Sequence, residues 1–348
     1  ILGGDSVIRQ AVLQYIHEEN ALDQLEQIIG NRSAVLIHGR QAYEAAAFAL
    51  PDVPRFLFEG HCTDQQVEAL KLSCAPYDVI LALGGGSVID TAKQVAFQLQ
   101  LPIIVIPTIV SNCAPWTPLS VMYDEQGQYL RFDTFPVVIE ALLLDHRILA
   151  ASPYDYFVAG LVDTLAKWYE ARALSGSSAE DPVIETALRT AERCKDLIIS
   201  TNVSETRFRE YSADIQYLVE TVIPLAGSIG GFGDAATRGA IGHAVHNALS
   251  PYRETHPFLH GSKVGYGLLV QEMLFGNDAD YAELHQYLLL QEQPTSLADF
   301  GVSLDIVEEL ALRTSTEELC RLLRPLVSAD QLVDAITRNE KTSVSMTS

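Results

Sequence analysis

Residues 79–87 read Val79-Ile80-Leu81-Ala82-Leu83-Gly84-Gly85-Gly86-Ser87, an unbroken apolar run that ends in three glycines and a serine. An apolar run of this kind is typical of a strand buried on both faces of a parallel sheet. Glycines between such a strand and a helix let the backbone approach an anion, toward which the free N–H groups of the helix start point. The stretch therefore predicts a pyrophosphate site. The glycines do not have the GxGxxG spacing, and no Gly-Lys-Ser/Thr of a nucleotide-triphosphate loop follows. A tight strand-to-helix turn is therefore the alternative.

The same alternation extends to both sides of this stretch. We expect strands over 34–39, 55–58, 79–83 and 101–108, and helices over 41–50, after Thr63 as N-cap, and over 88–98. Strands that alternate with helices are typical of a parallel sheet covered by crossover helices. The first part of the chain is thus predicted to be a doubly wound, Rossmann-like α/β domain.

The pattern changes near residue 150, after which strand-like runs almost disappear. Segments with helical periodicity follow over 154–174, 182–200, 206–221, 239–249 and 261–275. We therefore expect a dinucleotide-binding α/β domain over 1–150 and an all-helical domain over 151–348.

Composition excludes several classes of function. The 348 residues include 45 acidic and 23 basic ones, for a net charge of -22, which opposes binding to nucleic acid or to an anionic membrane surface. The five cysteines show no CxxC spacing, which favours a reducing cytoplasm over a disulfide framework. No apolar run reaches the roughly 18 residues of a membrane span.

Histidines concentrate in one part of the predicted helical domain. His243 and His246 are one helical turn apart, and His260 follows shortly afterwards. Three imidazoles of this kind could bind a divalent metal if an acid joined them. The spacing does not say which acid.

Polar residues also follow the glycine loop. Asp90 lies in the first turn of the next helix, where it either contacts a ligand or only complements the helix dipole, and Lys93 is expected to be a solvated charge. Residues 107–118 form a long loop of hydroxyls and prolines after a strand, at the sheet edge where ligands bind in open α/β sheets.

Four motifs together resemble the iron-containing alcohol dehydrogenase superfamily, and within it the glycerol dehydrogenase branch with its hydroxycarboxylate dehydrogenase relatives. They match in one order over nearly the whole chain, at residues 84–93, 107–108, 160–167 and 243–261. The resemblance implies a dehydroquinate synthase-like architecture. It also implies a metal and a nicotinamide that meet in the cleft between an N-terminal nucleotide-binding domain and a C-terminal helical domain.

The resemblance also implies the missing acid. By motif, Asp163 joins His243 and His260 as a metal ligand. Asp163 lies in an apolar helical run, where a buried carboxylate is costly unless it is paired or bound to a metal, and this supports the assignment. His246 then either relays protons or orients a water, or forms a hydrogen bond in the core.

Lys167 departs from the pattern of the iron-dependent members, which have a histidine ligand at this position. A protonated lysine does not bind a metal, so three protein ligands and an open position are expected, as in catalytic zinc sites. The expected metal is zinc, with iron, manganese and nickel as alternatives.

Cys113 replaces a carboxylate that accepts hydrogen bonds from the polyol in the glycerol enzymes. Losing such an acceptor costs on the order of 1–3 kcal/mol and disfavours a polyol. With Lys167 and Trp116 nearby in the matched motifs, the sequence resembles the hydroxycarboxylate branch, whose members reduce 2-oxo acids. The expected substrate residues are therefore Cys113, Trp116 and Lys167.

Arg40 follows Gly39 where NAD-preferring relatives have an aspartate that binds the ribose hydroxyls. An arginine there can bind a 2′-phosphate, so NADP(H) is expected in preference to NAD(H). The alternative is a solvent-exposed arginine at a helix start. The complete set of expected cofactor contacts is Arg40, Gly84, Gly85, Gly86, Ser87, Val88, Asp90, Thr108, Ser111, Thr117, Leu119 and Tyr123. Of these, Leu119 and Tyr123 could equally be packing residues of the loop.

The expected function is hydride exchange between NADP(H) and a small 2-oxo or 2-hydroxy acid. The expected catalytic residues are Asp163, His243, His260, Lys167 and His246. One alternative is an NAD-dependent polyol dehydrogenase or a glycerol-1-phosphate dehydrogenase. Another is a catalytically retired ligand-binding protein. A homo-oligomer is allowed but not specified by the sequence.

Overall fold

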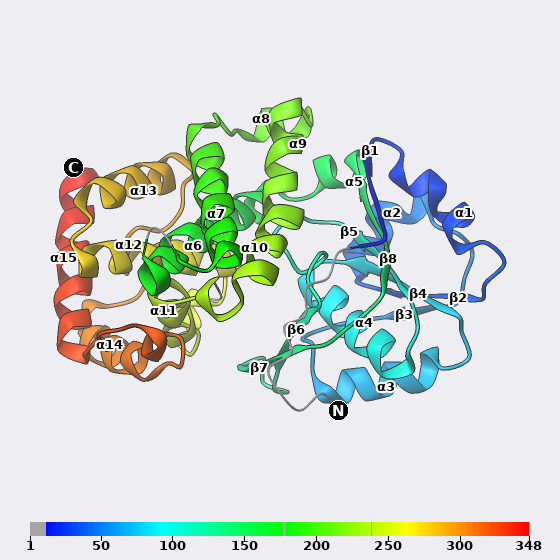
Figure 1. Cartoon of the computed structure of the whole chain (residues 1–348), viewed down its shortest axis with the longest axis horizontal. Coiled ribbons are helices and arrows are strands. Elements are labelled where there is room, and N and C mark those ends of the chain that lie inside the picture. Colours follow the sequence, from blue (N-terminus) through cyan, green and yellow to red (C-terminus); the bar gives the residue numbers. More distant parts are fainter. Residues whose placement is uncertain (1–11, 177–178, 238, 348) are drawn as a thin grey trace. The chain divides into compact units, whose positions relative to one another are not determined.

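The computed structural model describes residues 12–176, 179–237 and 239–347 (Figure 1). Internal contacts divide the chain into two compact units, Ile1–Phe157 with Val203–Gly231, and Val158–Asn202 with Phe232–Ser348. This differs from the expected division at residue 150, because the segment 203–231 packs with the α/β part. Helical periodicity identifies such a segment as helix but does not say which core it joins.

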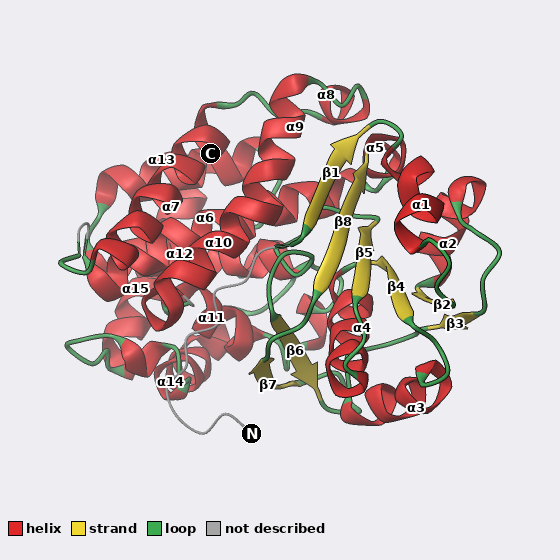
Figure 2. Cartoon of the chain, turned by 45° about the vertical axis from the view of Figure 1, so that its right-hand side comes forward, coloured by secondary structure: helices red, strands yellow, loops and turns green. Residues whose placement is uncertain are grey.

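The first unit contains a parallel six-stranded sheet in the order β1-β8-β5-β4-β2-β3, as the sequence predicts for a doubly wound fold. Its strands are β1 (Gln14–Glu18), β2 (Ala34–His38), β3 (Arg55–Leu57), β4 (Val79–Gly84), β5 (Ile103–Pro107) and β8 (Ile139–Asp145). A separate antiparallel hairpin consists of β6 (Leu119–Tyr123) and β7 (Tyr129–Thr134). The strands of the sheet are yellow in Figure 2.

Helices cover both faces of this sheet. The unit's helical elements are η1 (Ala21–Gln24), α1 (Leu25–Ile29), α2 (Arg40–Ala46), η2 (Ala47–Ala49), α3 (Asp64–Cys74), α4 (Gly86–Leu99), α5 (His146–Ala151), α8 (Glu205–Arg209), α9 (Ala213–Glu220), the π-helical turn η3 (Thr221–Leu225) and α10 (Ala226–Gly233). Thr63 caps α3 as predicted, since its hydroxyl accepts a hydrogen bond from the Gln66 backbone N–H at 3.2 Å.

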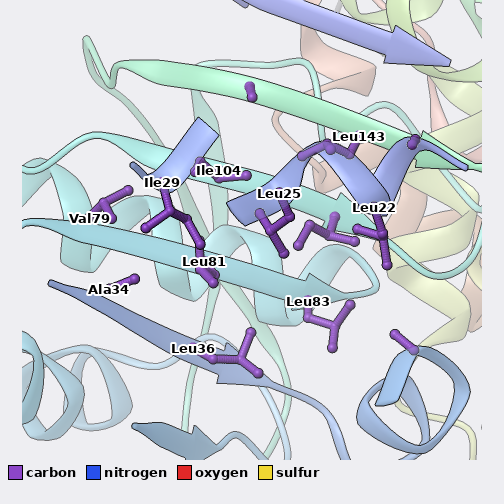
Figure 3. Packing of buried hydrophobic residues seen from close by; sticks show 14 of the residues in the cluster. Leu22, Leu25, Ile29, Ala34, Leu36, Val79, Leu81, Leu83, Ile104 and Leu143 are labelled. Atoms are coloured by element: carbon purple, nitrogen blue, oxygen red, sulfur yellow. The ribbon is translucent and has the colours of Figure 1, made fainter. Parts of the chain in front are cut away.

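One face of the sheet forms the hydrophobic core shown in Figure 3. Alternate residues of a strand point to the same face, so Leu36, Leu81 and Ile104 of neighbouring strands lie together. They pack against Leu22 and Leu25 from the η1–α1 segment. Each fully buried side chain of this size contributes roughly 1.5–3 kcal/mol.

The edge strand β1 was not predicted, because its sequence Gln-Tyr-Ile-His-Glu has no apolar run. Helical segments from residues 203–231 contact it. The His17 ring of β1 forms hydrogen bonds with the Glu220 carboxylate at 2.7 Å and the Tyr211 hydroxyl at 3.0 Å. The helix predicted over 206–221 is in fact two helices, α8 and α9, and the break includes Tyr211 with a φ of 48°.

The second unit is helical, as predicted, and no strand occurs among its described residues. Its elements are α6 (Tyr154–Ser175), α7 (Pro182–Ser200), η4 (Asp234–Thr237), α11 (Ile241–Leu249), η5 (Arg253–Thr255), α12 (His260–Phe275), α13 (Asp278–Leu290), η6 (Ala298–Phe300), η7 (Leu304–Ile306), α14 (Val307–Thr316), η8 (Cys320–Leu322) and α15 (Ala329–Thr347). Helix α6 begins and α10 ends at the junctions between the two units.

Candidate metal and cofactor sites

The three predicted ligands come together within the helical unit. Asp163 lies in the middle of α6, His243 in α11 and His260 at the first position of α12, and one ligand atom from each lies within 4.8 Å of the others. Asp163 Oδ1 is 3.5 Å from His243 Nε2 and 3.2 Å from His260 Nε2. Three donors from three helices are thus directed at one point.

The aspartate oxygen in this group is buried and lacks a partner of good geometry. The Asp163 side chain is 9% exposed, and its Oδ1 forms no hydrogen bond within the described chain despite the two nearby imidazoles. An unsatisfied buried carboxylate oxygen beside two ring nitrogens fits a divalent metal ion, which would satisfy all three. The His260 side chain, at 45% exposure, leaves the group accessible.

Two glycines allow the helices to approach this closely. A Cβ on Gly261 would lie 1.9 Å from the Ala159 carbonyl oxygen, on the turn of α6 that precedes Asp163. A Cβ on Gly267 would lie 2.4 Å from the Gly242 carbonyl oxygen, next to His243. The helices α6, α11 and α12 therefore pack backbone to backbone at the points where they carry the ligands.

Opposite charges stabilise the charged forms of the cluster. Burial disfavours the Asp163 carboxylate, but the close imidazoles of His243 and His260 outweigh it and hold the pKa of Asp163 well below its usual range. Burial likewise disfavours the His243 imidazolium, but the carboxylates of Glu170 and Asp163 raise the pKa of His243 to about 10. Without a metal, the two carboxylates therefore favour the protonated form of His243.

Glu170 is a site residue that the sequence reasoning missed. It lies two turns after Asp163 on α6, is 2% exposed, and its Oε2 is 2.6 Å from His243 Nδ1. Although burial disfavours its charge, the His243 charge and hydrogen bond lower the pKa of Glu170. The available signal was an acid on the same face of an apolar helix as Asp163.

His246 lies next to the cluster but outside the ligand group. Its Nε2 is 3.1 Å from His260 Nδ1, and its Nδ1 is 3.0 Å from the Asn247 side-chain oxygen. Burial, followed by the nearby charges of His260, Lys263 and His243, keeps the pKa of His246 well below its usual range, so the ring is neutral. Both expected roles, proton relay and hydrogen bonding, remain compatible with this geometry.

Two lysines belong to the same helices as the ligands. Lys167 is half-buried, one turn after Asp163 on α6. Lys263 is one turn after His260 on α12, is 8% exposed, and forms no side-chain hydrogen bond or ion pair with the described residues. Burial lowers the pKa of Lys263. Only Lys167 could be predicted from the sequence, because nothing in the local pattern shows that Lys263 is buried.

In the α/β unit, the glycine loop has the predicted form. Strand β4 ends at Gly84, Gly85 is the N-cap of α4, and Ser87 and Val88 are in its first turn. A Cβ on Gly85 would lie 2.7 Å from the end of the Ile109 side chain, so a larger residue there would require that side chain to move. The start of α4 therefore presents backbone N–H groups at the carboxyl end of a buried strand.

Other expected cofactor residues gather at the same sheet edge. Strands β2, β4 and β5 are parallel neighbours, so Arg40, Gly84 and Thr108 lie side by side at or just after their carboxyl ends. The Thr108 N–H donates to the Gly84 carbonyl at 3.1 Å. Ser111 and Thr117 lie in the following loop, both half-buried.

The expectation that Lys93 is a solvated charge is wrong. Its side chain is fully buried and lies 2.8 Å from Asp90 Oδ1 as an ion pair. Its ammonium also donates to the carbonyls of Ala114, at 2.9 Å, and Thr117, at 3.1 Å, and to that of Leu119. The Asp90–Lys93 pair thus joins α4 to the loop before β6. The Asp90 carboxylate and three backbone carbonyls offset the cost of removing the ammonium from water, which the local sequence could not reveal.

The remaining expected residues have internal contacts in the α/β unit. Trp116 packs edge-on against the Tyr15 ring, with centroids 5.9 Å apart, and Cys113 is half-buried in the same loop. Leu119 and Tyr123 are the first and last residues of β6, and the Tyr123 ring contacts that of His61. Packing is therefore part of the role of Trp116 and Tyr123.

Arg40 stands at the first position of α2 with an exposed guanidinium. Its Nη2 is 2.8 Å from the carboxylate of Glu59, which follows β3. That carboxylate stabilises the charge of Arg40 and raises its pKa. A phosphate bound by Arg40 would compete with Glu59.

Comparisons with known proteins agree with this fold. The family model for iron-containing alcohol dehydrogenases matches residues 13–146. Hydroxycarboxylate dehydrogenase A of Escherichia coli (strain K12) is 35% identical over 315 residues, which cover 87% of this chain and 86% of that protein. A glycerol dehydrogenase of Thermotoga maritima is 30% identical over 326 residues, with 88% of each protein covered.

A solved structure extends the agreement to the whole fold. The crystal structure of a probable glycerol dehydrogenase from Sinorhizobium meliloti 1021 superimposes with a TM-score of 0.84, covering 98% of this chain and 100% of that one at 24% identity. In the described ranges, no helix has the length and apolarity needed to cross a membrane. The chain belongs to the iron-containing alcohol dehydrogenase family and is an oxidoreductase related to hydroxycarboxylate and glycerol dehydrogenases.

Proposed function

We propose that the chain is a metal-dependent oxidoreductase that exchanges hydride between NADP(H) and a small 2-oxo or 2-hydroxy acid. The observation that carries the proposal is the convergence of Asp163, His243 and His260 within 4.8 Å, with an unsatisfied buried carboxylate oxygen among them. The relative named hydroxycarboxylate dehydrogenase A, at 35% identity over most of the chain, supports the substrate class.

Asp163, His243 and His260 are the proposed metal ligands. One carboxylate and two imidazoles with an accessible side suit catalytic zinc, and iron, manganese and nickel accept the same donors. When bound, the metal supplies a Lewis acid that stabilises negative charge on the substrate oxygen. We propose His246, which is hydrogen-bonded to His260, as the residue that holds or passes a proton near that oxygen.

The lysines supply the charge that selects an acid. An ammonium that is buried without a counter-ion attracts an anion strongly, since little water competes. Within the described part of the chain Lys263 has this property, and half-buried Lys167 is the second candidate for binding the substrate carboxylate. Cys113, in place of the acidic residue expected in a glycerol enzyme, removes a group that would repel that carboxylate.

Arg40 supports the preference for NADP(H). Its exposed guanidinium lies at the carboxyl end of β2, where it is available to a 2′-phosphate. The neighbouring Glu59 reduces this preference, because it shares Arg40 and would repel the phosphate. We therefore propose that NADP(H) is preferred and that NAD(H) is also accepted. A homo-oligomeric state and a cytoplasmic location remain predictions.

An NAD-dependent polyol dehydrogenase is the second candidate, because a glycerol dehydrogenase from Thermotoga maritima is 30% identical to the chain. A glycerol-1-phosphate dehydrogenase and a retired binding protein are weaker alternatives.

A spectrophotometric screen separates all of these candidate functions. NADPH and NADH oxidation is followed with 2-oxo acids, aldehydes and dihydroxyacetone, the reverse reaction with glycerol and glycerol 1-phosphate, and the bound metal is measured. Higher kcat/KM with NADPH and a 2-oxo acid supports the proposal. Higher values with NADH and dihydroxyacetone support a polyol enzyme, and no turnover after metal loading supports a binding protein.

A further inference from the structure

We propose that Glu170 and Glu317 are positioning residues whose carboxylates set the hydrogen-bond direction around both metal-binding imidazoles, one directly and one through Asn247 and His246. This inference rests on the proposed metal site at Asp163, His243 and His260. A histidine binds a metal through one ring nitrogen, and the hydrogen bond at the other nitrogen decides which one is free.

At His243 the direction of the hydrogen bond follows from a single contact. Glu170 Oε2 is 2.6 Å from His243 Nδ1. A carboxylate only accepts hydrogen bonds, so Nδ1 must donate, and Nε2 is the nitrogen that remains to bind a metal. Nε2 is also the atom that faces Asp163, at 3.5 Å.

The same carboxylate is fixed at its other oxygen. Glu170 Oε1 accepts hydrogen bonds from the backbone N–H groups of Ala240, at 2.7 Å, and His243, at 2.9 Å. It thereby satisfies free donors at the start of α11. The carboxylate is thus held on one side by a helix end and on the other by the ring, so it cannot rotate without losing buried hydrogen bonds.

At His260 the direction is transmitted through two side chains. The Asn247 amide nitrogen donates to Glu317 Oε2 at 3.0 Å, and since a carboxylate cannot donate, this orients the amide. The Asn247 oxygen must then face His246 Nδ1, 3.0 Å away, which donates to it. An imidazole that carries its single ring proton on Nδ1 leaves Nε2 as the hydrogen-bond acceptor.

The last hydrogen bond of this series joins His246 to the proposed metal ligand His260. His246 Nε2 is 3.1 Å from His260 Nδ1, so His260 Nδ1 donates and His260 Nε2 remains for the metal. His260 Nε2 faces Asp163 Oδ1 at 3.2 Å. Two hydrogen-bond chains that begin at different acids thus present both Nε2 atoms to the same carboxylate.

Glu170→Gln tests the hydrogen bond between Glu170 and His243, because it keeps the shape of the side chain and reverses the direction of that bond. The two backbone N–H groups require the glutamine oxygen at the Oε1 position, so its NH2 group faces His243 Nδ1. That nitrogen must then accept, and the ring proton moves to the nitrogen that faces Asp163. We expect Zn²⁺ affinity, measured by competition with a chelator, to fall about 10–100-fold.

Glu272→Gln is the matched control. Glu272 is also a buried carboxylate of the helical unit, but it pairs with Arg172 at 2.6 Å and not with a histidine. The Glu272→Gln variant should therefore bind Zn²⁺ as tightly as wild type. Thermal melting of the metal-free proteins measures how much stability each variant loses. The absorption spectrum of bound Co²⁺ should change in Glu170→Gln and not in the control.

Substitutions at Asn247 test the second hydrogen-bond chain, from Glu317 to His260, and do so even if Glu170→Gln does not fold. Asn247→Leu removes the amide, so His246 is no longer held in one orientation and Zn²⁺ affinity should fall about tenfold. The double variant Asn247→Asp, Glu317→Gln exchanges the two ends but keeps an acceptor facing His246 Nδ1. It should restore most of the affinity lost in Asn247→Leu, which an effect of packing alone would not predict.

The Zn²⁺ affinity of the wild-type chain and of Asp163→Ala is measured first, which separates this inference from the proposed function. If wild type binds no Zn²⁺, or Asp163→Ala binds it equally well, the proposed metal site is wrong. If that site stands but Glu170→Gln and Asn247→Leu bind Zn²⁺ as tightly as wild type, only the positioning proposal is overturned. The positioning proposal is also overturned if the double variant binds Zn²⁺ no more tightly than Asn247→Leu.

Discussion

The Ala159 carbonyl oxygen occupies the space next to Gly261 where a side chain would begin, 1.9 Å from the position of a Cβ atom. This contact joins α6 to α12 at the turn before Asp163 and directly after His260. We expect Gly261→Ala to push the helices apart, destabilising the fold by about 1–3 kcal/mol or more and weakening metal binding.

Gly230→Ala is the control for that substitution, since no atom lies within 4 Å of a Cβ at this position in α10. An alanine there should be neutral or stabilise by roughly 0.5–1 kcal/mol. Thermal melting and chelator competition measure both effects. Equal melting temperatures for Gly261→Ala and wild type would contradict the close approach of the two helices.

Asp163 is the proposed ligand whose loss should be most severe, because it is the only carboxylate of the triad. Asp163→Ala should reduce bound metal to trace levels and lower kcat/KM by about a hundredfold or more. Metal analysis after dialysis and steady-state kinetics measure the two quantities. Unchanged metal content and turnover would show that the triad assignment is wrong.

Lys263 and Lys167 make different predictions for the choice of substrate. If Lys263 binds the carboxylate, Lys263→Met should lower kcat/KM for 2-oxo acids by about tenfold to a hundredfold and leave neutral aldehydes nearly unaffected. It should also stabilise the fold, because it removes a buried charge that has no ion-pair partner among the described residues. Lys167→Met shows which lysine acts. An equal loss for acids and aldehydes in both variants would remove the basis for an acid substrate.

The Arg40–Glu59 pair predicts opposite effects of two substitutions on cofactor preference. Arg40→Asp should lower the NADPH-to-NADH ratio of kcat/KM by about tenfold or more, because it replaces a donor to the 2′-phosphate with a repelling charge. Glu59→Gln should raise the same ratio, since Arg40 is then free to bind phosphate. A ratio that neither substitution changes means that Arg40 is only a solvent-exposed residue of α2.

His243 predicts how the stability of the metal-free protein depends on pH. The acids around it raise its pKa from 6.5 to about 10 on folding, so the stability it contributes is complete below pH 6.5 and is lost as the pH rises toward 10. Thermal melts in chelator should therefore show a decline over this range that His243→Asn lacks. In excess Zn²⁺ the decline should be smaller or reversed, because metal binding displaces the proton. Parallel pH profiles for the two proteins in chelator would contradict the raised pKa.

Local patterns were sufficient for much of the fold. The apolar run before Gly84 predicts a buried strand and the start of α4, because burial on both faces requires side chains of that kind. Periodicity likewise identifies the long helices α6, α7 and α12. It fails at β1, whose polar edge sequence becomes a strand only because β8 supplies a hydrogen-bonding partner.

For the site, the sequence by itself determined the donor types and, through the resemblance of its motifs, the set Asp163, His243 and His260. Only the tertiary structure decided which acids lie behind the histidines and which lysines are buried. In the sequence, Glu170 and Lys263 look like ordinary charged residues of their helices, and Glu317 looks like an ordinary charged residue just after α14. Their environments are set by side chains distant in sequence, and the cost of burying a charge depends on which partners the packing of helices brings within reach. The same reason explains why Lys93 is buried, since its partners are backbone carbonyls of a loop that no helical pattern describes.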